Sequence, residues 1–135
     1  MAEIRLTALR PKSMDERSAS VSVTLVSAQT GTGATDHVDL AGYVSKAIVT
    51  VVNGATNTCD VKVQGSHDAS TWADIAHTAV EGSTRDAAPK STAEQVAAGA
   101  TAFLCLIPGE WPRYVRANVT GANANGVSIY LFAER

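Results

Sequence analysis

The chain has 135 residues, of which 45% are hydrophobic, and a formal net charge of −2. Its length suits a single domain with its own core, and the slightly acidic balance supplies no broad positive field for nucleic acid or an anionic membrane surface. The sequence lacks an N-terminal apolar segment and any run of about 18 apolar residues, so we expect a soluble protein, made in a cytoplasm, that binds neither membrane nor nucleic acid.

Residues 1–19 mix charged and apolar side chains and include Pro11, which removes a backbone donor. We expect an N-terminal arm that docks on its own domain or on a neighbouring subunit, with a solvated terminus as the alternative. The arm contributes six candidate partner-binding residues, which are basic or apolar: Arg5, Leu6, Leu9, Arg10, Lys12 and Arg17.

The first strand of the domain is expected at residues 20–27, where Ser and Val alternate with the period of a half-buried strand. A loop rich in Gly and Thr follows from Gln29 to Asp36. It does not resemble a phosphate-binding loop, because residues 35–40 have a strand pattern rather than the helix that such a loop precedes.

Residues 46–52 are nearly all β-branched or apolar, which is typical of a central strand that is buried on both faces. Asn53-Gly54 is a strong turn signal, and it predicts that residues 58–65 form the return strand of a hairpin. A short loop then leads to residues 71–77, whose imperfect alternation indicates a bulge or a twisted edge strand.

Residues 81–99 interrupt the strand pattern and form a long loop in our prediction. Ser91 and Glu94 have the spacing of a capping box, so a short helix is expected at residues 91–98. Long loops of this kind are disordered or functional. The functional option is contact with another subunit, for which Arg85 and Lys90 are the candidate residues.

Three more strands are expected at residues 101–107, 113–120 and 127–133, separated by turns that contain Gly, Pro and Asn. This makes about eight short antiparallel strands in one domain. The predicted fold is therefore an all-β, single-domain antiparallel β-sandwich, a jelly roll of about eight strands that spans residues 20–135 behind the arm.

Residue types capable of chemistry are scattered. His37, His67 and His77 do not have the spacing of a metal site. Ser66, His67 and Asp68 are adjacent on a predicted turn, where they cannot line up as nucleophile, base and acid, and Asp68 is expected to accept backbone hydrogen bonds. We expect no enzymatic activity, no metal and no cofactor.

The two cysteines, Cys59 and Cys105, lie within apolar alternation and are expected to be small buried hydrophobic residues. A bridge between them is conceivable only if their strands are neighbours, and a reducing compartment argues against it. Trp72 and Trp111 are expected to anchor the core or a sheet edge.

Two segments, residues 65–72 (GSHDASTW) and residues 113–116 (RYVR), resemble a signature of discoidin-like, galactose-binding-like sandwiches. In that family a Ser-x-Asp turn leads to a Trp, and an Arg-Tyr-Val-Arg strand follows. The resemblance implies a jelly roll in which the Trp and Tyr mainly serve the fold. The family's aromatic binding spikes and bridging cysteine pair are missing, and a carbohydrate-binding module of a phage tail or fibre is the alternative function.

The whole plan, a small sandwich rich in Ala, Thr, Gly and Val with a leading arm, resembles the capsid decoration or cement proteins of tailed bacteriophages, of the jelly-roll type found in a Bordetella podovirus. The resemblance implies a virion protein on the outer surface of the capsid that bridges adjacent subunits of the major capsid protein. Such a protein needs no catalysis, and a homo-oligomer, with a dimer favoured, is expected as well.

Overall fold

The computed structural model describes residues 3–4, 20–121 and 126–135, and these residues form two β-sheets. The seven-stranded sheet contains β1 (Glu3–Ile4), β3 (Gly33–Ala34), β4 (His37–Asp39), β6 (Cys59–Ser66), β7 (Ala73–Asp74), β10 (Glu94–Val96) and β12 (Tyr114–Thr120). The six-stranded sheet contains β2 (Ser20–Gln29), β5 (Lys46–Asn53), β8 (His77–Glu81), β9 (Thr84–Arg85), β11 (Thr101–Leu106) and β13 (Val127–Glu134).

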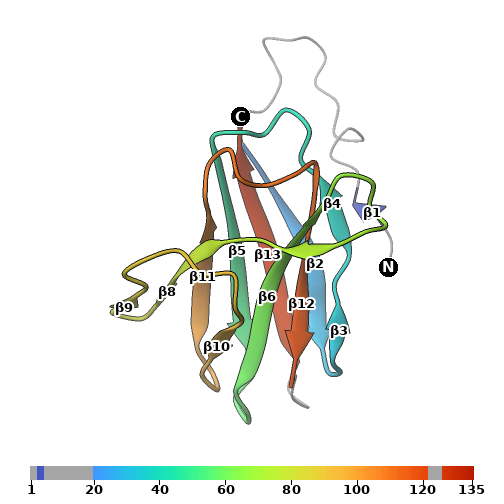
Figure 1. Ribbon diagram of the computed structural model, residues 1–135. Helices are drawn as coiled ribbons and strands as arrows, with labels where there is room; N and C mark the ends of the chain where they lie inside the picture. Colours follow the sequence, from blue (N-terminus) through green and yellow to red (C-terminus); the bar gives the residue numbers. More distant parts are fainter. Residues whose placement is uncertain (1–2, 5–19, 122–125) are drawn as a thin grey trace.

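Eight of these strands build the framework. In one sheet the order is β4-β12-β6-β10, and in the other it is β2-β13-β5-β11 (Figure 1). The chain changes sheet between consecutive framework strands, and from β6 to β10 it does so by way of β8 in the other sheet, which is the connectivity of a jelly roll. The all-β antiparallel sandwich expected from the sequence is confirmed, with short additional strands at its edges, of which β1 runs parallel to β4.

The core lies between the two sheets and is filled by side chains that alternate along each strand. In β12, Val115, Ala117 and Val119 are fully buried, whereas the residues between them face outward. Val, Leu, Ile and Ala dominate the buried set. Small β-branched side chains pack closely on pleated sheets, which explains how a chain with few aromatic residues still forms a continuous core.

The strand at β5 is central, as expected, but only one of its faces is covered. Ala47, Val49 and Val51 point into the core, whereas Val52 on the other face is 39% exposed. The prediction of burial on both faces is therefore wrong for the chain by itself.

The hairpin expected at Asn53-Gly54 is also wrong, although both strands exist. β5 pairs with β11 and β13, whereas β6 pairs with β7, β10 and β12 in the other sheet. The turn carries the chain across the sandwich. A local turn signal cannot specify this, because a tight turn can join two strands of one sheet or of two facing sheets.

Residues 71–99 differ most from expectation. Only Ala73–Asp74 of the strand expected at residues 71–77 pairs with β6, and a new strand, β8, begins at His77. The helix expected at residues 91–98 is wrong, since Glu94–Val96 pairs with β6 and Val96 is fully buried. Burial of Val96 outweighs the weak helix preference of the Ala-rich segment.

Both cysteines are free, and their strands belong to different sheets. Cys59 is buried, and this burial, followed by the negative charges of Asp60 and Glu81, raises the pKa of its thiol to about 11. It remains protonated and unreactive at neutral pH. Cys105 lies on the outer face of β11 and is only half-buried, so the prediction that it is buried is only partly right.

Within the described ranges, no helix has the length and apolar character needed to cross a membrane.

Candidate interaction surfaces

The residues predicted to bind a partner fall into two groups. Six of them lie in residues 5–19, outside the described residues: Arg5, Leu6, Leu9, Arg10, Lys12 and Arg17. The other two are described, and their environments differ. Arg85 is exposed on the edge strand β9, whereas Lys90 is half-buried between β8 and β10. Their binding to another protein stays a prediction.

Lys90 has carboxylate partners in its own chain. Its Nζ lies 2.5 Å from Glu94 Oε1 and 3.3 Å from Asp86 Oδ1, and these contacts, with the Glu94 hydrogen bond foremost, raise its pKa. Asp86 Oδ2 also accepts a hydrogen bond of 2.8 Å from the amide of Ala79 in β8. The three charges therefore tie Asp86, Lys90 and Glu94 to one another and to β8, while residues 87–89 and 91–92 between them are exposed.

His77 lies beneath this ion cluster. Its side chain is fully buried, and its backbone exchanges two 2.9 Å hydrogen bonds with Lys90. By distance and angle neither ring nitrogen makes a hydrogen bond within the described residues, although the Ile75 carbonyl lies near enough to affect the charge of the ring. Burial, and then the positive charge of Lys90, lower the pKa of the ring, while Asp86, the Ile75 carbonyl and Glu94 oppose that shift without reversing it. His77 is thus held in its neutral form.

A buried neutral histidine makes stability depend on pH. Above about pH 6.5 the ring is neutral in both the folded and the unfolded chain, so it contributes no pH dependence. Below that value the unfolded chain binds a proton that the folded chain rejects. The free energy of unfolding should therefore fall from pH 6.5 toward pH 5, and the His77→Leu variant should lose less over this window. Urea unfolding at both pH values measures the difference.

His67 provides the matched control, because its side chain is exposed on the turn after β6. The His67→Ala variant should keep the full wild-type pH dependence. A proton NMR titration of wild-type protein checks the cause, since the His77 ring should titrate below pH 6.5. Equal losses of stability in the wild-type and His77→Leu proteins would refute the assignment.

The fold brings the two discoidin-like segments together. In the β6–β12 ladder, Ser66 stands opposite Tyr114. The guanidinium of Arg116 lies 4.2 Å from the ring centroid of Trp72, at a distance suited to a cation–π contact. His37 completes the group, with its ring 5.5 Å from that of Trp72 and 5.7 Å from that of Tyr114.

A chain of charged and amide groups extends this group across the outer face of the seven-stranded sheet. Arg116 Nε donates to Gln64 (3.0 Å), and Gln64 Nε2 donates to Asp74 (3.1 Å), which also accepts from Lys62 (3.1 Å). At the other end, Arg113 makes a bidentate pair with Asp39, at 3.1 and 2.8 Å. We call these residues, with Trp72, His37, Tyr114 and Arg116, the polar ladder. Its groups bind one another and hold strands β4, β6, β7 and β12 in register.

The Ser66-His67-Asp68 turn is structural. Asp68 Oδ1 accepts hydrogen bonds from the amides of Ser70 (2.9 Å) and Thr71 (2.8 Å) and from the Ser66 hydroxyl (2.9 Å). These bonds, with Thr71 foremost, lower the pKa of Asp68 to about 2. The prediction that Asp68 accepts backbone hydrogen bonds is confirmed. In the part of the chain that the structure describes, no three His, Cys, Asp or Glu side chains gather as a metal site would require.

Trp111 anchors the end of the sandwich next to this turn. Its ring packs against the core cluster, and its Nε1 donates a 3.2 Å hydrogen bond to the carbonyl of Tyr43. Trp72 is half-buried beneath Arg116. Both indoles thus serve as the anchors that the sequence analysis expected.

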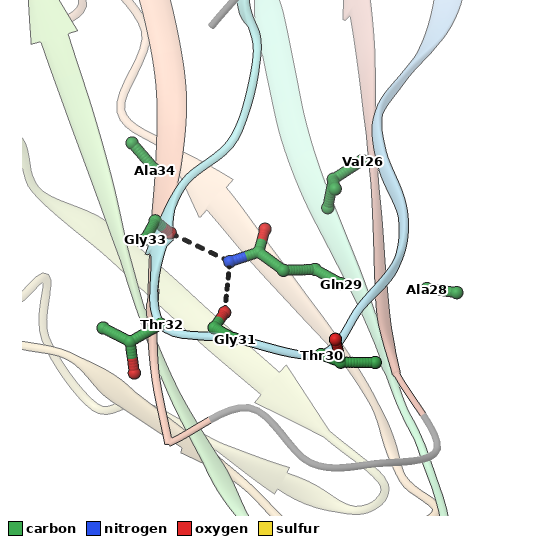
Figure 2. A pocket seen from close by; sticks show the side chains of 8 residues that line it. All are labelled: Val26, Ala28, Gln29, Thr30, Gly31, Thr32, Gly33 and Ala34. Carbon is green, nitrogen blue, oxygen red and sulfur yellow. Dashed lines mark hydrogen bonds between the residues drawn. The ribbon is translucent and has the colours of Figure 1, made fainter.

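At the Gln29–Asp36 loop, Val26 and residues 28–34 line an open hollow of about 620 Å³ (Figure 2). Gln29 Nε2 reaches across the loop and donates to the carbonyls of Gly31 (2.7 Å) and Gly33 (3.1 Å). The loop leads into the short strands β3 and β4, not into a helix. The side chain of Gln29 therefore shapes its own loop, and the geometry of a phosphate-binding loop is absent from these residues.

The outer face of the six-stranded sheet carries a surface that the sequence analysis did not single out. We call it the apolar sheet face, and its members are Ile48, Val52, Val80, Phe103, Cys105, Tyr130 and Phe132. Phe103 is 44% exposed, Val52 39% and Tyr130 38%. The signal is present in the sequence, because β5 and β11 have apolar residues on both faces, but for residues 46–52 this pattern predicts burial within the domain.

Comparisons with known proteins match the fold and leave the family open. No protein-family model matches the sequence, and no curated protein matches it. The chain is similar to a solved structure, the SPBc2 prophage-derived protein YomS, with a TM-score of 0.64 and 14% sequence identity. The match covers 86% of this chain and 93% of that chain. At this identity the likeness shows a shared fold.

Proposed function

We propose that this protein is a non-enzymatic structural component of a tailed-phage virion. In this role it decorates the outside of the capsid and bridges adjacent subunits of the major capsid protein. The observation that carries the proposal is the fold, which is shared over nearly its full length with a prophage-derived protein. The contacts within the jelly roll support a structural role as well, because the side chains of the polar ladder and of the Asp68 turn form hydrogen bonds that stabilise the fold.

A small sandwich that contacts two capsid subunits at once can bind tightly through two weak contacts. Once one contact with the capsid has formed, the second forms at a high effective concentration, so two modest contacts combine into tight attachment. The basic and apolar residues of the N-terminal segment, together with the exposed Arg85, are our candidates for these contacts.

The carbohydrate-binding alternative depends on an indole face that a sugar can stack on. Trp72 carries the Arg116 guanidinium over its ring, and Trp111 packs against the core. These contacts favour the capsid role. Retention of the wild-type protein on a glycan array, with loss on Trp72→Ala, would favour the alternative.

The capsid role predicts co-sedimentation of the purified protein with shells assembled from the major capsid protein of the same genome. Replacing Arg5, Arg10, Lys12 and Arg17 together with Ala should weaken binding by about tenfold or more, because each exposed ion pair contributes a few tenths of a kcal/mol to about 1 kcal/mol. Quantified pelleting over a concentration series measures the change.

Lys46→Ala is the matched control, since this lysine is exposed at the end of β5 and pairs with Glu134 in its own chain. It should bind shells like the wild type. Unchanged binding of the quadruple variant would remove the arm from the proposal, and failure of the wild-type protein to sediment with shells would overturn the capsid role itself.

A further inference from the structure

The apolar sheet face is continuous across strands. The ladder places Tyr130 opposite Thr50, Thr50 opposite Phe103, and Phe103 opposite Val80. The next row along the strands contains Phe132, Ile48, Cys105 and Thr78 in the same order. Val52 extends the face at its other end. No Asp, Glu, Lys or Arg occurs in these rows across the four strands. Charged residues lie at the rim, where Lys46 and Glu134 are 3.7 Å apart and Arg85 of β9 stands opposite Val80.

β5 and β11 carry apolar residues on both faces, which is typical of strands that are covered on both sides. Along β11, Ala102, Leu104 and Leu106 fill the core, while Phe103 and Cys105 face outward. Antiparallel sheets with one solvated face usually alternate apolar and polar residues. Exposed apolar residues that are scattered singly need no explanation, but a contiguous patch indicates an interaction site.

The lack of charged residues at the centre of the apolar sheet face indicates which kind of partner can bind there. A charged partner would find no complementary group in the central rows and would lose its own hydration there. A second copy of the chain presents the same uncharged, apolar surface. A twofold axis brings no like charges together at the centre, since the charged residues lie at the rim.

The outer side of the sheet is also large enough when its polar rim is included. The apolar sheet face lies at the centre of the outer side of β2, β13, β5, β11 and β8, and these five strands, about 4.8 Å apart, with about seven residues each at a rise of about 3.3 Å, give roughly 500 Å² for each copy. Two copies would then bury about 1,000 Å², which reaches the lower limit for a specific protein–protein interface.

We infer that two copies of this chain pair face to face through the apolar sheet face, around a twofold axis. The two six-stranded sheets would stack about 10 Å apart, with Phe103 and Tyr130 packed between them. This inference goes beyond the capsid role and does not depend on it. If both hold, the dimer offers a capsid two copies of every contact.

Sedimentation equilibrium of the 135-residue chain without capsids tests the inference. The wild type should have twice the chain mass of 14.0 kDa. Phe103→Asp should raise the dissociation constant at least about thirtyfold, because it places carboxylates in the centre of a desolvated face. Val52→Lys provides a second variant on a neighbouring strand, with the same expected outcome. Far-UV circular dichroism checks that each variant stays folded.

Gln95→Asp is the matched control, because Gln95 is exposed on β10 of the other sheet. It should leave the dimer unchanged. A wild-type chain that stays monomeric at high concentration overturns the inference. This holds even if a separate pelleting assay shows that Phe103→Asp weakens binding to capsids, because the face would then contact the capsid rather than a second copy. Dimers that persist in both folded face variants overturn it as well. Because the assay contains no capsid, its failure is distinguishable from failure of the capsid role.

Discussion

Replacing Asn53 with Ala should lower the free energy of unfolding by about 2 to 4 kcal/mol, because a buried donor that satisfies several carbonyls is lost. Asn53 is the last residue of β5, and only 4% of it is exposed. Its Nδ2 donates to the carbonyls of Asn57 (2.8 Å), Val96 (3.1 Å) and Ala97 (3.1 Å). One amide thus ties the turn between the sheets to the end of β10. Urea unfolding measures the loss.

A variant of the same shape separates the lost hydrogen bonds from the lost volume. Asn53→Asp keeps the size of the side chain but replaces the amide donor with an acceptor that faces the same carbonyls, so it should also be strongly destabilised at neutral pH. Gln95→Ala removes an exposed amide from β10 and should change stability by less than about 0.5 kcal/mol. An Asn53→Asp protein as stable as the wild type would show that these bonds contribute little.

The turn that follows Asn53 separates what is local in this sequence from what depends on tertiary contacts. Alternating Val, Ser and Thr predicts most of the framework strands, because the period of side-chain direction is a local property, and β10, expected as a helix, is the exception. The turn after Asn53 was recognised from its residue types. Which strands pair across that turn depends on contacts far apart in sequence, and the hairpin was therefore wrong.

The error at residues 91–98 has a similar cause. A capping-box spacing and several Ala residues favour a helix locally, yet Val96 completes the core and Glu94 binds Lys90. Tertiary contacts outweigh helix preferences of a few tenths of a kcal/mol per residue. For the candidate surfaces, the sequence points to basic and apolar residues of the N-terminal segment and to Arg85 and Lys90, whereas the apolar sheet face depends on which side of each strand the sandwich covers.

The discoidin-like segment depends on close packing at Gly65, and its replacement by Ala should lower the free energy of unfolding by about 2 to 3 kcal/mol. A Cβ at this position would lie 2.5 Å from Cδ and Cγ of Pro112 and 3.1 Å from Cγ2 of Ile75. The proline ring is rigid and cannot rotate away. Gly65 in β6 therefore allows the Pro112 loop to lie against the sheet beside the polar ladder, and thermal or urea unfolding measures the cost of blocking that approach.

A substitution of Pro112, the residue that a Cβ at position 65 would contact, tests the cause of this cost. Pro112→Ala removes Cγ and Cδ, so Gly65→Ala should cost much less in the Pro112→Ala background than in the wild type, and a double-mutant cycle gives the coupling. Gly31→Ala is the control for adding a methyl group, because a Cβ there meets nothing within 4 Å. It should be neutral or slightly stabilising. Equal costs of Gly65→Ala in both backgrounds would mean that contact with Pro112 does not select glycine at this position.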